Sequence, residues 1–170
     1  MSEPFVTILF ADLVGSTALY ARHGDDVADA LRRPHLDALR AAVDEHGGRE
    51  LRSTGDGLMV RFASALAALR CAIAMHGATT GAGDRLALRV GVDAGEPVGG
   101  DDDPYGTPVI VARQLCDIAE PGDILATDVV CRLPTPGACD RARRRAEAPW
   151  AGGARPRLTG ALARRGDDHG

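Results

Sequence analysis

Two short stretches of this 170-residue chain each place an aspartate beside small residues at the end of an apolar segment. The run Phe5–Phe10 is apolar and β-branched, which predicts a buried strand, and Asp12 follows it. A carboxylate at the end of a buried strand is costly unless a positive charge meets it. The small residues 15–17 can leave backbone N–H groups open at a helix start, where anions bind. A metal ion on Asp12, with phosphate groups on that turn, would satisfy both requirements.

The second stretch, Arg49–Phe62, repeats this arrangement. Two short predicted strands flank Gly55-Asp56-Gly57, a sequence typical of a hairpin turn with an acid at its tip. Two carboxylates at the ends of adjacent strands are what a two-metal phosphoryl-transfer site requires. Each acid also has a simpler interpretation, because Asp12 could cap the following helix and Asp56 could be an ordinary turn residue. Their occurrence together, in this order, favours the metal site.

Four motifs follow one another between Pro4 and Val130: FADLVGST, STGDGLMVRF, LRVGVDAGE and DPYGTPVIVARQLCDIAEPGDIL. Together they resemble the catalytic domain of class III nucleotide cyclases, which convert a nucleoside triphosphate into a 3′,5′-cyclic nucleotide and pyrophosphate. The resemblance implies an α/β (α+β) fold, with a ferredoxin-like βαββαβ sheet and helices on one face. It also implies a head-to-tail dimer, either a homodimer or a heterodimer with another cyclase domain, with active sites at the interface.

In this family the ribose 3′-oxygen attacks the α-phosphorus in line, so positioning and positive charge supply most of the rate. The resemblance assigns metal binding to three residues: Asp12, Asp56 and, through its backbone carbonyl, Leu13. These oxygen ligands, together with substrate phosphates, suit two ions of Mg²⁺ or Mn²⁺. The turn that would lie under the phosphates consists of Gly15, Ser16 and Thr17.

Two further positions match the residues that select the base in adenylate-type members of the family: Arg52, where a lysine is usual, and Asp103. A carboxylate at the second position accepts a hydrogen bond from the adenine amino group and repels the O6 atom of guanine, which favours ATP over GTP. Arg52 keeps the donor and the charge of a lysine but is bulkier and forked. Alternatively, Asp103 is a solvated loop acid in the run Asp101–Asp103, and Arg52 is a salt-bridge partner.

The helix after Tyr105-Gly106 departs from the family pattern at two positions. The family has an asparagine that orients the ribose and, four residues later, an arginine that stabilises the transition state; Ile110 and Gln114 stand there. Arg113 is adjacent, but one residue rotates a helical side chain by about 100°. Gln114 can donate a hydrogen bond without a charge, and losing such a cation costs about 10²–10³ in rate. Gln114 and Arg113 are therefore the candidate catalytic residues, and Ile110 is a candidate substrate contact.

Hydrophobic periodicity predicts the elements that must position these residues. A long helix should run from Ser16 or Thr17, which can cap it, to about His46, with a break near Gly24 and a kink at Pro34. The remaining prediction is strands over 49–53 and 58–62, a helix over 63–78, a loop over 79–84, a strand over 85–94, a hairpin over 95–103, a helix over 108–119 and a strand over 123–127. Such alternation indicates α/β or α+β packing.

This pattern fails after Leu133. Residues 134–170 carry eight arginines and four acids and are rich in Gly and Pro, which predicts a disordered tail in place of the family's C-terminal hairpin. We therefore place the cyclase homology domain at residues 1–133. Its net charge is −8, because the whole chain has −4 and the tail has +4. An acidic domain argues against nucleic acid as the partner.

The remaining features predict a cytoplasmic protein. No apolar run approaches the roughly 20 residues of a membrane span, and the N-terminus lacks a signal-peptide pattern. The four cysteines have no metal-ligand spacing. Cys71 and Cys116 lie in apolar helical segments and are predicted core residues.

We thus hypothesise a cytoplasmic, homodimeric class III cyclase that makes cyclic AMP from ATP with two divalent metal ions. The alternative is a degenerate cyclase-homology domain that binds nucleotide weakly or not at all and acts as a dimerisation or regulatory module. A third hypothesis, a different two-metal nucleotidyl transferase on the same scaffold, gives no role to the DPYG motif. The intact pair of aspartates favours the enzyme, whereas Ile110 and Gln114 favour the module.

Overall fold

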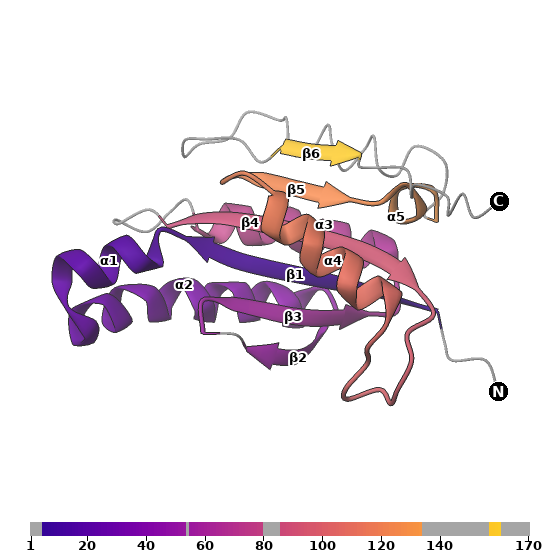
Figure 1. Ribbon diagram of the computed structural model, residues 1–170, viewed down its shortest axis with the longest axis horizontal. Coiled ribbons are helices and arrows are strands. Elements are labelled where there is room, and N and C mark those ends of the chain that lie inside the picture. The colour runs from indigo at the N-terminus through magenta and orange to yellow at the C-terminus, as the bar shows by residue number, and fades with distance from the viewer. Residues whose placement is uncertain (1–4, 54, 80–85, 134–156, 161–170) are drawn as a thin grey trace, which may run out of the picture.

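The computed structural model describes residues 5–53, 55–79, 86–133 and 157–160, which form a mixed sheet with helices on both faces (Figure 1). The strand order is β2-β3-β1-β4-β5-β6. The first four strands of this order pair antiparallel, whereas β5 runs parallel to β4 and β6 runs parallel to β5. The strands are β1 (Val6–Val14), β2 (Arg49–Ser53), β3 (Gly57–Phe62), β4 (Ala87–Gly95), β5 (Asp123–Ala126) and β6 (Arg157–Gly160).

The two faces of the sheet are covered unequally. The described helices are α1 (Ser16–His23), α2 (Asp25–Glu45), α3 (Ala65–Thr79), α4 (Thr107–Ile118) and α5 (Asp128–Arg132). α2 and α3 pack on one face and close the larger hydrophobic core, whereas α4 crosses the other face over β4 and β1 (Figure 1). The smaller core beneath α4 includes Ile8, Phe10, Met59 and Cys116.

Side chains alternate along β1, and this alternation decides which of them reaches each face. Leu9 and Leu13 lie in the core beneath α2 and α3. Ile8 and Phe10 lie in the core beneath α4. Asp12 continues this second series, so its carboxylate lies on the α4 side of the sheet.

α4 lies close to the sheet because β4 carries a glycine beneath it. A Cβ atom at Gly91 would lie 2.2 Å from the carbonyl oxygen of Ala112 and 2.3 Å from the backbone nitrogen of Cys116. Both distances are far below van der Waals contact, so any side chain at this position would push α4 away from the sheet. Gly91 therefore sets the height of α4 over β4 and β1.

The fold class and the order of the predicted elements are confirmed, with differences at their ends. The expectation of helices on one face is wrong, because α4 covers the face opposite α2 and α3. Gly24, with φ 77°, separates α1 from α2 as predicted, and α2 continues through Pro34. β1 extends to Val14, so Asp12 lies inside the strand and not after it. The predicted core positions Cys71 and Cys116 are buried, and burial raises the pKa of both thiols to about 12.

The edge of the sheet differs from the prediction. Residues 157–160 form β6 beside β5, so the prediction of a disordered tail is wrong for these four residues. The rest of that tail, residue Cys139 and most of the loop predicted over 79–84 lie outside the described residues. The short helix α5 has no counterpart in the prediction. None of the described helices is both long enough and apolar enough to cross a membrane.

His76 of α3 makes the stability of the fold depend on pH. Its side chain is 4% exposed, and burial lowers its pKa to about 4. Within the described part of the chain, its Nε2 atom has no hydrogen-bond partner. In an unfolded chain the pKa of histidine is about 6.5, so below that pH the unfolded state binds a proton that the folded state does not bind. The neutral imidazole therefore supports folding fully above about pH 6.5, and this support is lost as the pH falls toward about 4.

We predict that lowering the pH from 7 to 5 costs about 2 kcal/mol of unfolding free energy through His76. His76→Gln should lose correspondingly less over the same range, as measured by urea denaturation at both pH values. His23→Gln, which changes an exposed histidine of α1, is the control and should keep the wild-type pH dependence. Equal pH dependence in the wild type and in His76→Gln would contradict this account.

Candidate active site

Asp12 lies at the centre of the site because β1 has a partner strand on each side. In the sheet register it is opposite Gly57 of β3 and opposite Arg89 of β4. Arg89 donates to Asp12 Oδ2 from Nε at 3.0 Å and from Nη2 at 2.6 Å. The side chains of Asp12 and Arg89 are only 17% and 26% exposed, so the ion pair compensates a carboxylate that is largely removed from water. Hydrogen bonding to Asp12 raises the pKa of Arg89.

Asp56 lies in the turn between β2 and β3, one residue before the register partner of Asp12. Gly55 before it has φ 80°, a left-handed conformation that glycine adopts without strain. The backbone N–H of Leu13 donates to the Asp56 carbonyl oxygen at 2.9 Å. The hydroxyl of Ser16 donates to Asp56 Oδ2 at 2.6 Å. These two bonds tie the turn to the end of β1 and the start of α1, and they place the backbone of Asp56 next to that of Leu13.

The predicted phosphate-binding turn forms the start of α1. Gly15 is the N-cap residue, with a left-handed backbone (φ 98°), and no side chain caps the helix. The prediction that Ser16 or Thr17 caps this helix is therefore wrong. Ser16 is buried and its hydroxyl donates to Asp56, whereas Thr17 is exposed. Phosphate binding by this turn stays a prediction.

Asp56 also has a cation beside it, which comes from α2. Arg32 donates from Nη1 to the carbonyl oxygen of Gly55, and the same nitrogen lies 3.4 Å from Asp56 Oδ1. Its Nη2 contacts Asp29 at 2.5 Å. The hydrogen bond to Asp29 raises the pKa of Arg32, while Arg32 and then Arg33 hold the pKa of Asp29 below its ordinary value. Each acid of the predicted metal site thus faces an arginine.

This pair of carboxylates fits divalent ions such as Mg²⁺ or Mn²⁺. Within the described ranges no group of three or more His, Cys, Asp or Glu side chains is arranged to hold a metal. The described residues therefore contain no site that would enclose a metal with such side chains alone. Mg²⁺, however, is typically bound by one or two carboxylates together with water and substrate phosphates. The arginines on Asp12 and Asp56 already compensate part of the negative charge at this end of the sheet. The carbonyl of Leu13 stays a predicted ligand.

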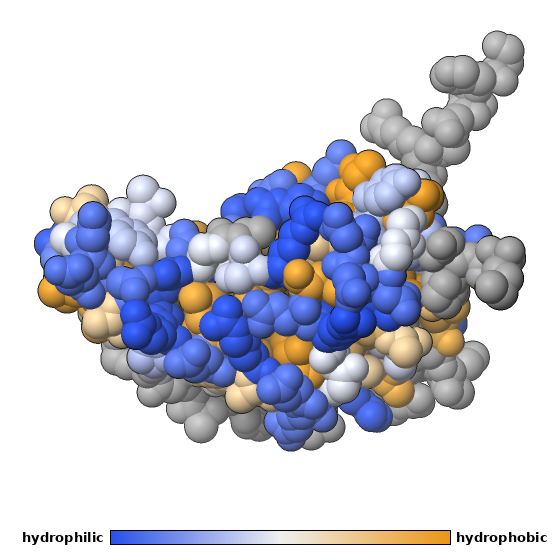
Figure 2. Space-filling view, turned by 90° about the horizontal axis from the view of Figure 1, so that it is seen from below, coloured by the Kyte–Doolittle hydropathy of each residue, from blue (hydrophilic) through white to orange (hydrophobic). Residues whose placement is uncertain are grey.

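A second group of charged residues joins the loop between β4 and α4 to β2 and β3. Three arginines pair with three consecutive aspartates of the loop: Arg61 with Asp101 at 3.0 Å, Arg49 with Asp102, and Arg52 with Asp103. Seen from the β2 side, hydrophilic side chains dominate the surface and apolar patches lie between them (Figure 2). The two residues predicted to select the base are therefore in contact with each other. Their simpler interpretations, as a salt-bridge partner and an exposed loop acid, describe the same contact.

α4 presents the two departures from the family pattern on one exposed face. Ile110 is 56% exposed, and Gln114, one helical turn later, is also exposed. Arg113 is directed elsewhere, with its Cζ 5.7 Å from the centre of the Phe10 ring and its Nη2 2.9 Å from Asp117 Oδ1. The helix is therefore not rotated to put Arg113 in the place of Gln114. Arg113 instead lies against β1, on the same face of the sheet as Asp12.

Two arginines of the site, Arg89 and Arg32, have no counterpart among the predicted residues. Arg89 belongs to the LRVGVDAGE motif, and strand alternation puts it on the same face as Gly91, beneath α4. That signal is present in the sequence. Arg32 is one of several arginines on a polar helix face, and its contact with the β2–β3 turn depends on how α2 packs. No local pattern marks it.

Comparison with known proteins bears on the family and the fold of the chain. A family profile described as "Adenylate and Guanylate cyclase catalytic domain" matches residues 2–147. "Putative adenylate cyclase 3" of Rhizobium meliloti (strain 1021) is 36% identical over 127 residues, which are 71% of this chain and 22% of that protein. The crystal structure of an adenylate/guanylate cyclase/hydrolase from Silicibacter pomeroyi has a TM-score of 0.65 at 32% identity, covering 79% of this chain and 81% of that one.

An adenylate cyclase structure from Trypanosoma brucei, in its monomeric state, has a TM-score of 0.74 at 20% identity, covering 81% of this chain and 79% of that one. At that identity the likeness concerns the fold. The chain spans about a fifth of the length of the Rhizobium protein. The family profile continues to residue 147, past the predicted domain end at residue 133. The match of the profile to most of the chain, together with the fold, shows that the chain belongs to the adenylate and guanylate cyclase catalytic domain family.

Proposed function

We propose that this domain converts ATP into 3′,5′-cyclic AMP and pyrophosphate, using two divalent metal ions at a dimer interface. The observation that carries the proposal is the meeting of Asp12, from β1, and Asp56, from the β2–β3 turn, at one end of the sheet. Family membership supports the cyclase reaction class over a different two-metal nucleotidyl transferase on the same kind of fold.

At this end of the sheet each residue has a distinct proposed role. Asp12, Asp56 and the Leu13 carbonyl would hold Mg²⁺ or Mn²⁺, which supplies charge to activate the ribose hydroxyl and to neutralise the triphosphate. Arg89 donates to Asp12 from Nε and Nη2 and to the Asp117 carbonyl from Nη1, and it is partly exposed, so the remaining N–H groups of its guanidinium could donate to substrate phosphates at the same place. The backbone N–H groups of the turn 15–17 would donate to those phosphates as well.

Base selection is assigned to the contact between Arg52 and Asp103. A carboxylate accepts a hydrogen bond from the amino group of adenine, whereas guanine presents an oxygen at the equivalent position. Arg52 pairs with Asp103 and is itself a donor for the base. The pair therefore favours ATP over GTP.

A second chain is proposed to complete the site. Arg52 and Asp103 form a charged group apart from Asp12 and Asp56, so each cluster needs a counterpart from another chain. Apolar side chains that are at least half exposed lie on α4 and on the loop before it: Val98, Tyr105, Ile110 and Ile118. A surface of this kind is suited to burial against a partner. We propose a homodimer, with a heterodimer of two cyclase domains as the alternative.

The second candidate function is a non-catalytic cyclase-homology domain that dimerises or binds nucleotide. Gln114 and Ile110 favour it, because neither brings the charge or the ribose contact of the family pattern. Arg113 is paired with Asp117 and packed over Phe10, so it would have to leave both partners to serve in place of Gln114. If the domain is an enzyme, Ile110 and Gln114 imply a low rate of cyclic nucleotide formation.

The chain spans about a fifth of the Rhizobium relative, so any signal that regulates this domain is a separate proposal about a longer protein. The proposed substrate, ATP, is an intracellular metabolite. We therefore place the proposed activity in the cytoplasm, as a source of a cyclic nucleotide for signalling.

The purified protein should form cyclic AMP from ATP with Mn²⁺ or Mg²⁺, and less cyclic GMP from GTP. Asp12→Asn and Asp56→Asn should each lower cyclic AMP formation by about 10² or more, because each removes a proposed metal ligand. Asp26→Asn, an exposed acid in the first turn of α2, is the matched control and should keep the wild-type rate. No product from either nucleotide, in a protein that dimerises in solution, would support the non-catalytic domain instead.

Arg89→Met should lower kcat/KM for ATP by about 10², because it removes a cation from the phosphate end of the site. The same change leaves Asp12 without its ion-pair partner, so Mn²⁺ should raise the melting temperature of this variant more than that of the wild type. Arg132→Met, which changes an exposed arginine of α5 paired with Asp128, is the control. If Mn²⁺ raised the melting temperature of all three proteins equally, the proposal that Arg89 neutralises the charge of Asp12 would be contradicted.

Asp103→Asn should lower the ratio of kcat/KM for ATP to that for GTP by about tenfold, because an amide can donate to the O6 of guanine as well as accept from adenine. Asp102→Asn changes the neighbouring acid, which pairs with Arg49, and should leave the ratio unchanged. Steady-state rates with both nucleotides decide between the two acids. If the ratio changed in Asp102→Asn and not in Asp103→Asn, the assignment of base selection to Asp103 would be wrong.

A further inference from the structure

The turn that carries Asp56 is held from two sides. From β1 and α1 it receives the Leu13 N–H on its carbonyl oxygen and the Ser16 hydroxyl on Oδ2. From α2 it receives Arg32, which donates to the Gly55 carbonyl and lies 3.4 Å from Asp56 Oδ1. The two carboxylate oxygens thus face different partners, so the orientation of the carboxylate is fixed by both.

Arg32 is suited to hold this turn because its own position is fixed. Its side chain is 16% exposed, and its Nη2 is anchored by Asp29, three residues earlier on the same helix. In the described part of the chain its Nε is buried without a hydrogen-bond partner. The contacts that locate the guanidinium are therefore those of its two terminal nitrogens, one to the helix and one to the turn.

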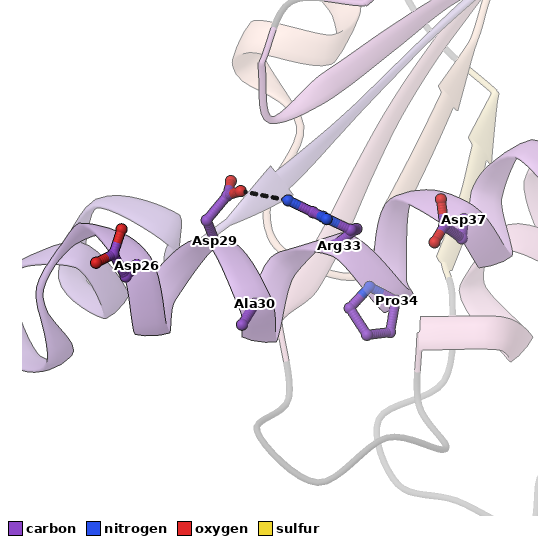
Figure 3. Close-up of a pocket in the computed structure, with 6 residues that line it drawn as sticks. All are labelled: Asp26, Asp29, Ala30, Arg33, Pro34 and Asp37. Carbon is purple, nitrogen blue, oxygen red and sulfur yellow. Dashed lines mark hydrogen bonds and ion pairs between the residues drawn. The ribbon is translucent and has the colours of Figure 1, made fainter.

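The neighbouring arginine provides a natural comparison. Arg33 also pairs with Asp29, at 3.0 Å, but it is 72% exposed. Figure 3 shows Arg33 reaching back along α2 to Asp29, with Pro34 and Asp37 following it on the helix. Removing Arg33 therefore takes the same charge from the same helix without removing a contact to the turn.

We propose that Arg32 is a positioning residue for Asp56, acting through the Gly55 carbonyl and the Asp56 carboxylate. This inference rests on the proposed function, in which Asp56 is a metal ligand. Arg32 does not touch the substrate in this proposal. It keeps the turn, and with it the second carboxylate, in the place where Asp12 and Asp56 can share metal ions.

The first test uses the metal-free protein and does not depend on catalysis. The Leu13 amide donates to the Asp56 carbonyl, so its hydrogen exchange reports the opening of the turn. Arg32→Met should speed exchange of the Leu13 amide, and Arg33→Met should leave it at the wild-type rate. Equal exchange in the wild type and Arg32→Met would overturn the proposal.

The second test measures Mn²⁺ affinity by electron paramagnetic resonance of the free ion, on folded protein. Arg32→Met should bind Mn²⁺ about tenfold more weakly or worse, because Arg32 donates to the Gly55 carbonyl and only approaches Asp56 Oδ1 at 3.4 Å, whereas Arg89 donates twice to the Asp12 carboxylate itself. Arg33→Met should match the wild type, and Arg32→Lys should be intermediate. Lysine keeps a charged donor for the turn but cannot contact Asp29 at the same time. Unchanged affinity in Arg32→Met, despite faster exchange at Leu13, would overturn the metal-positioning role.

These two readouts separate the inference from the function on which it rests. A wild-type protein that binds no Mn²⁺ would overturn the proposed function and the metal-positioning role together, while the Leu13 exchange rate would still decide whether Arg32 holds the turn. Should Arg32→Met fail to fold, Arg32→Lys gives both measurements. If Arg32→Lys then gave wild-type values in both measurements, the proposal that the forked side chain of Arg32 must contact Asp29 and the turn at once would be wrong.

Discussion

Two carboxylates that are partly removed from water, carried by neighbouring segments at one end of a sheet, are the constraint on which the rest of this structure depends. A strand with a neighbour on each side can meet it: β3 brings the turn with Asp56 to β1, and β4 brings Arg89. Helices supply the remaining partners, Ser16 of α1 and Arg32 of α2. These partners balance the charges without closing the site, since the side chains of Asp12 and Asp56 remain 17% and 37% exposed.

The two faces of the sheet serve different purposes. The face beneath α2 and α3 is an apolar core, and it fixes the strands. On the other face α4 packs closely because Gly91 has no side chain. The strands β2 and β3 carry the arginines that pair with the loop before α4. Exposed ion pairs contribute little stability one at a time. Three of them in register, between β2 or β3 and the run Asp101–Asp103, nevertheless determine where the loop lies, and with it the acid proposed to select the base.

How far the sequence predicts this structure depends on whether a feature is local. Turn and breaker residues are local signals, so the start of β2 after Gly47-Gly48 and the break at Gly24 are predicted correctly. Ser16 has the composition of a helix cap, and the competing acceptor on Asp56 is 40 residues away, so its role could not be predicted from its neighbours. The contacts of Arg32 and Arg89 with the acids span 24 and 77 residues. β6 was missed for a different reason, because strand pairing uses backbone groups and needs little from the side chains.

The distribution of positive charge limits how the proposed reaction could proceed. All 20 basic residues counted as Lys or Arg are arginines, which remain charged at any pH at which the protein is folded. The cations nearest the two acids, Arg89 and Arg32, come from the same chain as the acids, whereas the exposed position on α4 holds the neutral Gln114. If a partner chain brings only Gln114, charge that develops on the α-phosphate must be met by metal ions and by Arg89. In this domain the burden of catalysis would then shift from the interface to residues within one chain, and dimerisation would serve substrate binding more than transition-state stabilisation.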